Sequence, residues 1–279
     1  MTLNTRTAMT AARTPRQQHF LDRYGPWAVV TGASSGIGRA LACRLAEAGL
    51  NLVLVARRRP LLDALAAQLS AHRGVKVLVI DADLAQEAAL EAIEAATADL
   101  DVGLLVASAG FGSSGPFLDA DLAVEVEMLM VNCRAMLCAC SNFGRRFRQR
   151  GRGGLVLLSS IAAFQGMPYA AHYAATKAYV QSLAEALQVE LQPDGVDVLA
   201  AAPGPTHSGF AARAGQRLGT ALQPDAIAQP ILDALGRQAT VLPGSLSKLL
   251  TLSLVPLPRW VRVRIMGKVM QGMRQPPGG

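Results

Sequence analysis

The sequence predicts an α/β fold in which one doubly wound parallel sheet carries helices on both faces. Three observations lead to this prediction. Apolar runs of strand length alternate strictly with helical patterns, which implies right-handed crossovers and a parallel sheet. The strand runs are apolar throughout, as expected for strands that are covered on both faces. The chain has 279 residues, 51% of them apolar, so it can form one large core and nothing forces two domains.

The first strand leads into a glycine-rich turn at residues 31–38 that reads Thr-Gly-Ala-Ser-Ser-Gly-Ile-Gly. An Ala/Leu-rich helical pattern follows and ends at Gly49, a natural helix stop. In the turn, Gly32 permits a tight bend, Gly36 lets the backbone approach a bulky anion, and Gly38 lets the helix pack close to the strand. The N–H groups and the dipole at the helix start suit a pyrophosphate. The turn therefore indicates a dinucleotide site, although a turn of this kind can also be purely structural.

The other elements follow from the same two patterns. Strands are expected at residues 27–30, 51–56, 75–80, 103–107, 155–159, 196–201 and 239–242, and helices at 39–48, 60–73, 86–98, 122–150, 170–191 and 223–236. Pro60 suits the first turn of its helix, Gly74 ends that helix, and the arginine-rich last turns of the fourth helix complement its dipole. Because doubly wound sheets bind ligands at the carboxyl ends of their strands, we expect the chemistry in the segments that follow the strands.

The two ends of the chain differ from its middle. Residues 1–22 are expected to be a disordered tail, because the first 18 lack acidic side chains and apolar periodicity. Residues 23–244 are expected to form the dinucleotide-binding domain, and residues 245–279 a basic, apolar segment. No acidic residue follows Asp233, so this end accounts for the net charge of +7, which therefore does not indicate a nucleic-acid partner. The segment is expected to pack on the domain, on a partner subunit or on a membrane surface, or to close over an apolar substrate.

The cysteines and histidines do not indicate a metal site. The chain has four of each, and none stand at zinc-site spacing, so we expect buried thiols in a reducing compartment and no metal. The N-terminus lacks the apolar core of a signal peptide, and no run of about 18 apolar residues could cross a bilayer. A cytoplasmic location is expected, with peripheral contact at a membrane as the alternative.

Four polar side chains are candidates for catalysis. Tyr173 and Lys177 stand four residues apart in a predicted helix, so both project from one face. An ammonium group stabilises a phenolate, so we expect the pKa of Tyr173 to lie below its ordinary value of about 10 and to suit proton exchange. Ser160 follows the fifth strand, where its hydroxyl can hold a substrate oxygen or cap a helix. Asn132 lies in an apolar helical segment, where an unsatisfied buried amide would cost about 1–3 kcal/mol.

Taken together, these features resemble the short-chain dehydrogenase/reductase family over roughly residues 24–235. The resemblance rests on the glycine turn, Asp83, Ser108-Ala109-Gly110, Asn132, Ser160, Tyr173 with Lys177, and Pro203-Gly204. It implies a Rossmann-like fold, a catalytic tetrad of Asn132, Ser160, Tyr173 and Lys177, and a mobile substrate flap at residues 210–224. By the same resemblance, Asn132 bends its helix and holds the lysine through water. Ser108 stands where the family usually has an asparagine, so an amide that ties neighbouring strands is missing.

The cofactor is expected to be NADP(H) rather than NAD. Ala56 stands where an acid would bind a ribose 2′-hydroxyl, and Arg57, Arg58 and Arg59 follow it. Positive charges are unfavourable at the start of a helix, so the presence of three arginines there needs a further explanation. Binding of the 2′-phosphate is one explanation, and Arg57 is its expected ligand. The alternative is that the arginines form a solvated basic turn. The resemblance adds Asp83, which can also be a helix cap, at the adenine and Thr206 at the nicotinamide carboxamide. It implies the remaining cofactor-binding residues Gly32, Ser34, Ser35, Gly36, Ile37, Gly38, Leu84, Ala109, Gly110, Tyr173, Lys177, Pro203 and Gly204.

These expectations combine into one function. The protein is expected to be an oxidoreductase that transfers hydride between NADP(H) and an alcohol or carbonyl compound, with an apolar, lipid-, steroid- or ketoacyl-like substrate. We expect a homo-oligomer. The alternative is a dinucleotide-binding redox sensor without catalysis, for which Tyr173 and Lys177 would not be needed.

Overall fold

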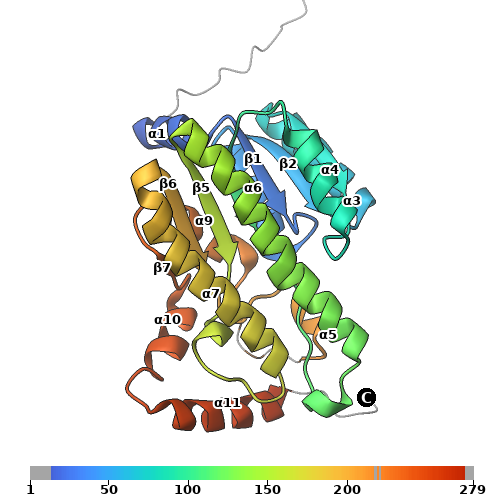
Figure 1. Ribbon diagram of the computed structural model, residues 1–279, viewed down its shortest axis with the longest axis vertical. Coiled ribbons are helices and arrows are strands. Elements are labelled where there is room, and N and C mark those ends of the chain that lie inside the picture. The colour runs from blue at the N-terminus through green and yellow to red at the C-terminus, as the bar shows by residue number, and fades with distance from the viewer. Residues whose placement is uncertain (1–13, 217–218, 220, 274–279) are drawn as a thin grey trace, which may run out of the picture.

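A seven-stranded sheet runs through the centre of the protein in the computed structural model, which describes residues 14–216, 219 and 221–273 (Figure 1). All neighbouring strands are parallel, in the order β3-β2-β1-β4-β5-β6-β7. Their bounds are β1 Trp27–Thr31, β2 Asn51–Ala56, β3 Val77–Asp81, β4 Val102–Ala107, β5 Gly153–Leu158, β6 Val196–Ala201 and β7 Thr240–Val241. The strand order reverses between β1 and β4, which confirms the predicted doubly wound sheet.

Helices cover both faces of the sheet. One face packs against α2 (Gly36–Glu47), α3 (Arg59–Arg73) and α9 (Pro224–Ala234), and the other against α4 (Glu87–Thr97), α6 (Ala135–Arg150) and α7 (Ala171–Leu191). Side chains of a strand alternate between the two cores: Val30 of β1 belongs to the first and Val29 to the second, and neither is exposed. This double covering explains why the strands are apolar throughout.

The helix expected at residues 122–150 is continuous but not regular. It consists of α5 (Leu122–Leu129), a π-helical turn at Met130–Arg134, and α6. The π turn contains Asn132, whose side chain is completely buried. Such turns inside α-helices are frequent at functional sites.

The expectation of a disordered tail is wrong for residues 15–22, because α1 spans Pro15–Tyr24. The Thr14 hydroxyl accepts the backbone N–H of Gln17, and the Gln17 side chain accepts the N–H of Thr14, which forms a capping box. At the other end, the Tyr24 hydroxyl donates to Asp197 of β6 over 2.6 Å. The start of the tail, residues 1–13, lies outside the described residues.

The last helices lie together at one end of the molecule. There α10 (Ser245–Leu252) and α11 (Arg259–Met273) lie across the carboxyl ends of β5 and β6 (Figure 1). The short elements are α8 (Gly209–Arg213) and three 3-10 turns, η1 Phe117–Asp119, η3 Ile161–Phe164 and η4 Gln192–Asp194. Among the described residues, no helix has the length and apolar character needed to span a bilayer.

Candidate active site

A cavity of about 730 Å³ opens at the carboxyl ends of the strands, where the sequence predicts the chemistry. It brings together the glycine turn after β1, the arginines after β2, the Ser108–Gly110 segment after β4, Ser160 after β5 and the segment after β6. Tyr173 and Lys177 reach it from α7. Each predicted site residue except Asn132 lines this cavity, and Asn132 lies directly beneath its Gly110 wall.

The glycines of the turn are closely packed against neighbouring segments, while the turn also lines the cavity. A Cβ atom at Gly38 would lie 2.5 Å from the Gly32 carbonyl oxygen, and one at Gly36 would lie 2.9 Å from Ser208 Cβ. Gly32 and Gly36 also have positive φ angles of 68° and 57°. Ser35 is the N-cap of α2 but its side chain makes no capping bond, so the first N–H groups of this helix face the cavity without a side-chain partner. These features fit the pyrophosphate of a dinucleotide.

The three arginines after β2 have different partners. Arg57 forms ion pairs with Glu127 at 3.1 Å and with Asp83 at 3.9 Å. Arg58 donates hydrogen bonds to the hydroxyls of Ser34 (2.9 Å) and Ser35 (2.7 Å) in the glycine turn. The third, Arg59, pairs with Asp63 and Asp81 and lies outside the cavity. Arg57 and Arg58 therefore both border the cavity, as does Arg213 of α8, whereas the sequence singles out Arg57 for the 2′-phosphate.

Asp83 contacts its own loop as well as Arg57. Its Oδ1 atom accepts the Ala85 N–H at 3.1 Å, while the N-cap of α4 is Gln86. Asp83 therefore stabilises a local turn before α4 but is not the N-cap of that helix. Asp83 and its neighbour Leu84 both line the cavity.

Ser160, Tyr173 and Lys177 meet at the base of the cavity. Ser160 caps the η3 turn by accepting the Ala162 N–H at 3.1 Å, and its hydroxyl lies near enough to the Tyr173 side chain to lower the pKa of the phenol. The capping interpretation of this serine is therefore confirmed, and its role toward a substrate oxygen stays a prediction. The Lys177 ammonium donates to the Leu158 carbonyl at 2.7 Å and lies 5.9 Å from the centre of the Tyr173 ring.

The expected lowering of the Tyr173 pKa is wrong in this structure. Loss of hydration raises the pKa of its hydroxyl to about 12, against a smaller lowering by the Ser160 hydrogen bond. The same burial lowers the pKa of Lys177 to about 8. The reason is that the two groups share one dry environment, and the lysine is bonded to a carbonyl oxygen rather than to the phenol.

Asn132 satisfies its amide within the protein. Its Oδ1 atom accepts the Phe111 N–H at 3.1 Å, and its Nδ2 atom donates to the Phe111 carbonyl (2.9 Å) and the Thr176 hydroxyl (3.0 Å). A Cβ atom at Gly110 would lie 3.0 Å from Asn132 Oδ1 and 3.4 Å from Lys177 Nζ, so a side chain at this position would press on both groups. The amide thus connects the strand end after β4 to α7 through the π turn.

The segment after β6 is held by a residue that the sequence did not reveal. Thr206 donates to the Gly204 carbonyl at 3.0 Å, and the Gly204 N–H donates to the Ser247 hydroxyl at 2.9 Å. Ser247 belongs to α10 and has no exposed surface. A serine among leucines gives no signal in the sequence, because only the folded chain brings α10 against this turn.

One wall of the cavity is apolar. It is formed by the η3–α7 connection, α8 and the inner faces of α10 and α11, through Met167, Phe210, Leu250, Leu254, Ile265, Met266, Val269, Met270 and Met273. The sequence did not indicate which apolar side chains of α10 and α11 would face the cavity. The described part of the C-terminal segment, residues 245–273, therefore packs on its own domain with one face and lines the cavity.

A family model described as short chain dehydrogenase matches residues 26–218, more than half of the chain. The chain belongs to the short-chain dehydrogenase family. A 7beta-hydroxysteroid dehydrogenase of Clostridium sardiniense is 30% identical over 234 residues, which cover 82% of this chain and 90% of that protein. Two solved structures are also similar. A short-chain dehydrogenase of Sphingobium yanoikuyae in complex with NADPH is 32% identical, with a TM-score of 0.74 and coverage of 91% of this chain and 99% of that one. The bulky-bulky ketone specific alcohol dehydrogenase of Comamonas testosteroni is 31% identical, with a TM-score of 0.72 and coverage of 91% and 97%.

This short-chain dehydrogenase is therefore an oxidoreductase that uses NADP(H) and interconverts an alcohol and a carbonyl compound. Bound NADP(H) supplies or accepts the hydride, and the glycine turn with its neighbouring arginines fits such a cofactor. The enzyme interpretation is favoured over a redox sensor.

The short-chain dehydrogenase keeps its strands tied together in spite of Ser108. The hydroxyl of Thr31, at the end of β1, accepts the N–H groups of both Ser108 and Ala109 at 3.1 Å. A Cβ atom at Gly38 would lie 3.0 Å from the Ser108 hydroxyl, so the small side chain lies against the turn. The connection between neighbouring strands is made by Thr31.

Proposed function

We propose that the substrate is a bulky, apolar ketone or the corresponding secondary alcohol, of lipid, steroid or ketoacyl type. The observation that carries this proposal is the apolar wall above Tyr173, formed largely by α10 and α11. Apolar side chains favour a substrate in proportion to the apolar area that it buries, about 25 cal/mol per Å². A cavity of about 730 Å³ provides room for such a group beside the cofactor. The similar proteins named for a hydroxysteroid and for bulky ketones support the same class.

The tetrad residues have separate roles in this proposal. Tyr173 exchanges the proton of the substrate hydroxyl, and Ser160 orients that oxygen through its own hydroxyl. Lys177 binds ribose hydroxyls and, when charged, lowers the cost of the Tyr173 anion. Asn132 fixes the Gly110–Phe111 backbone beside the lysine.

The cofactor residues have roles as well. Gly32 to Gly38 cradle the pyrophosphate, with Ser34 and Ser35 at its side. Asp83 and Leu84 border the adenine, Ala109 and Gly110 the ribose, and Pro203, Gly204 and Thr206 the nicotinamide. We assign the 2′-phosphate to Arg57 together with Arg58, because both guanidinium groups border the cavity.

A panel of ketones tests the substrate class by loss of NADPH absorbance. Bulky apolar ketones should have kcat/KM values at least tenfold above those of small polar ketones. A Met266→Ala variant in the cavity wall should change the ranking among bulky ketones, whereas Leu249→Ala, whose side chain is 66% exposed on α10, should not. Higher activity on small polar ketones would overturn the proposed class.

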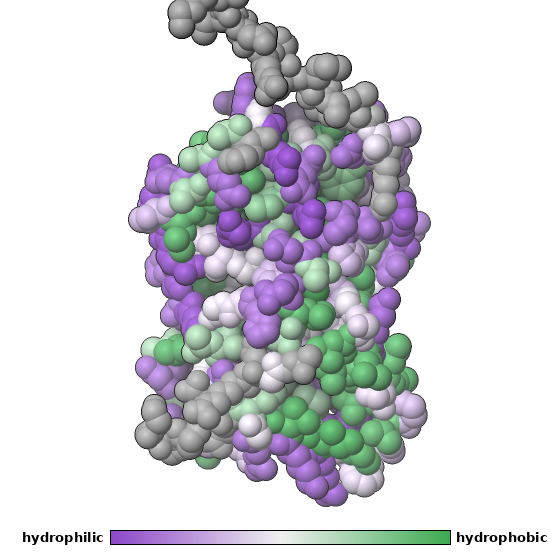
Figure 2. Space-filling model, turned by 180° about the vertical axis from the view of Figure 1, so that it is seen from behind, coloured by the Kyte–Doolittle hydropathy of each residue, from purple (hydrophilic) through white to green (hydrophobic). Residues whose placement is uncertain are grey.

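The outer faces of α10 and α11 support peripheral contact with an anionic membrane. Leu249, Leu252, Val255 and Trp260 each expose more than half of their surface, and Figure 2 shows apolar side chains gathered at this end of the molecule. Among the described residues, no ion pair involves the nearby cations Lys248, Arg259, Arg264 and Lys268. Exposed apolar and unpaired basic groups on one surface suit an interface with anionic lipids, at about 1 kcal/mol for each cation.

Co-sedimentation with phosphatidylserine and phosphatidylcholine vesicles tests this contact. Binding should require the anionic lipid, weaken at high salt, and fall in Leu249→Ser with Trp260→Ser. Leu118→Ser is the matched control, because Leu118 is 93% exposed but lies beside Asp119 and Asp121. Equal and negligible sedimentation of wild type with both lipids would contradict the proposal.

A homo-oligomer and a cytoplasmic location also stay proposals. Exposed apolar side chains on α5, α6 and α7, among them Leu122, Leu137 and Val189, support self-association. Light scattering of wild type and of a Leu137→Lys variant tests it, since loss of a dimer or tetramer in the variant is expected. The four cysteines carry free thiols, as a reducing compartment requires.

A further inference from the structure

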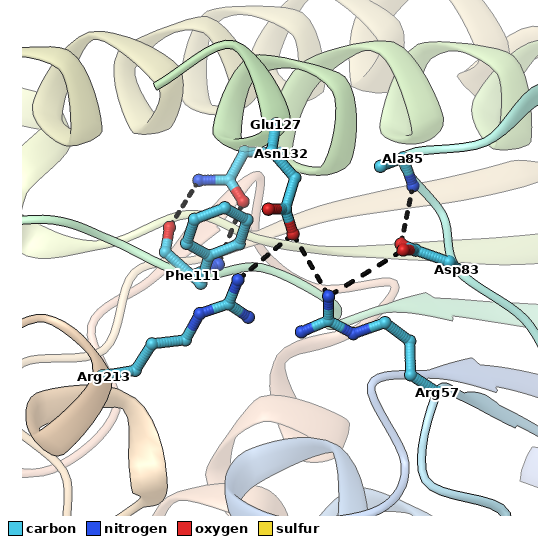
Figure 3. Close-up of polar contacts among 7 residues, drawn as sticks. All are labelled: Arg57, Asp83, Ala85, Phe111, Glu127, Asn132 and Arg213. Carbon is cyan, nitrogen blue, oxygen red and sulfur yellow. Dashed lines mark hydrogen bonds and ion pairs between the residues drawn. The ribbon is translucent and has the colours of Figure 1, made fainter. Parts of the chain in front are cut away.

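One carboxylate joins the two halves of the cavity rim. The Oε1 atom of Glu127, on α5, lies 3.1 Å from Arg57 Nη1 and 3.2 Å from Arg213 Nη2 (Figure 3). Arg57 follows β2 on the cofactor side, and Arg213 is the last residue of α8 in the predicted substrate flap. Glu127 therefore pairs with one arginine on the cofactor side of the cavity and with one in the predicted substrate flap.

Arg213 is held in place by more than this charge. Its guanidinium group lies 3.6 Å from the centre of the Phe111 ring, a favourable cation–π contact. The Phe111 backbone is fixed by both ends of the Asn132 amide (Figure 3). The C-terminal end of α8 is thus held by a cation–π contact at a rigid point and by an ion pair with Glu127, besides the contacts of Phe210 with Tyr173 and of Ala214 with Ser114.

A phosphate near Arg57 changes this arrangement. A 2′-phosphate carries more negative charge than a carboxylate and accepts bidentate hydrogen bonds from arginine. It would attract Arg57 and repel Glu127, which can then pair with Arg213 alone. A cofactor without the 2′-phosphate leaves Glu127 shared between the two arginines.

We propose that Glu127 is a positioning residue that couples the 2′-phosphate site to the substrate flap. Without the phosphate, Glu127 pairs with Arg57 and thereby weakens phosphate binding. When the phosphate binds Arg57, Glu127 pairs with Arg213 alone, and this second ion pair becomes stronger. The coupling rests on the proposed 2′-phosphate site, and it does not depend on which ketone is the substrate.

Cofactor binding without substrate gives the first test. Exposed ion pairs contribute about 0.2–1 kcal/mol, and the upper part of this range changes an equilibrium by about two- to fivefold. Glu127→Gln should therefore lower the Kd for NADPH about two- to fivefold and leave the Kd for NADH unchanged. Glu87→Gln is the matched control, because it removes the same charge from another exposed ion pair, with Arg134, away from the cavity. This control should change neither Kd.

Hydrogen exchange of the backbone at residues 209–216 gives the second test. At saturating cofactor, NADPH should protect this segment more than NADH does in wild type. The difference should disappear in Glu127→Gln and in Arg213→Ala, while Glu127→Asp should retain part of it. The KM for an active ketone should rise about two- to fivefold in Glu127→Gln.

Three results would overturn the proposal. The first is equal protection of the flap by NADPH and NADH in wild type. The second is a Glu127→Gln variant that binds both cofactors more weakly, as expected of a residue that only stabilises the fold. The third is an Arg57→Ala variant that keeps the NADPH-specific protection. A ketone panel without activity leaves these binding and exchange results unaffected, so it bears on the proposed substrate alone.

Discussion

Replacement of Asn132 by leucine should cost stability as well as activity. Leucine is close in shape to asparagine but forms no hydrogen bonds, so the Phe111 N–H and carbonyl both lose their partner. Phe111 is only 3% exposed, and each unsatisfied buried group costs about 1–3 kcal/mol. The two together predict a loss of about 2–6 kcal/mol in the free energy of unfolding. Thr176 keeps a partner, because its hydroxyl also donates to the Tyr173 carbonyl.

Urea unfolding followed by circular dichroism measures this loss. Met128→Leu is a suitable control: Met128 is fully buried one turn earlier in the same helix, and a volume-conserving exchange there should cost less than about 1.5 kcal/mol. A loss below about 1 kcal/mol in Asn132→Leu, with an unchanged dependence on urea, would refute the reasoning that the amide holds the Phe111 backbone.

Three further predictions concern the reaction centre. Tyr173→Phe keeps the ring contact with Phe210, so NADPH affinity should persist while kcat falls about 10²–10⁴-fold; more than a tenth of wild-type activity would contradict its role as proton donor. Arg57→Ala and Arg58→Ala should each lower the ratio of kcat/KM for NADPH over NADH, and a wild-type ratio below one would contradict both assignments. Lys177 has a pKa lowered to about 8, so the unfolded chain binds more protons between about pH 8 and its ordinary pKa of about 10.5, and this residue makes stability rise with pH in that window. The free energy of unfolding of wild type relative to Lys177→Met should therefore be higher at pH 10 than at pH 7. An equal difference between the two proteins at both pH values would contradict the lowered pKa.

The sequence predicted the sheet well because its signals are local. The run at residues 196–201 became β6 without a shift, and the strand at 51–56 became β2. An irregularity at Asn132 is expected from the family resemblance, but its π-helical form and the Phe111 partner of the amide have no signal in the local sequence. The α1 helix has a local signal in its capping box at Thr14 and Gln17, but the lack of apolar periodicity around it favours a disordered tail.

The site was predictable as a set of residues but not as a set of interactions. Spacing brought Tyr173 and Lys177 to one face, whereas the pKa of Tyr173 depends on burial, which no spacing reveals. The three arginines after β2 look alike in sequence, and only the fold distinguishes Arg58, at the glycine turn, from Arg57, at Glu127. Glu127 and Ser247 carry no motif, so their contacts at the cavity rim emerge only from tertiary structure.

The cavity has two kinds of wall, and this division matters for engineering. Ser160 and Lys177 are fixed by hydrogen bonds to the turn after β5 and to the end of β5, whereas a second wall consists of aliphatic and methionine side chains on α10, α11 and the segment between them. Substitutions of these apolar side chains can be combined without removing a hydrogen bond of Ser160 or Lys177. Libraries restricted to Leu254, Ile265 and Met266 should therefore yield catalysts for new ketones while the chemical step remains the same.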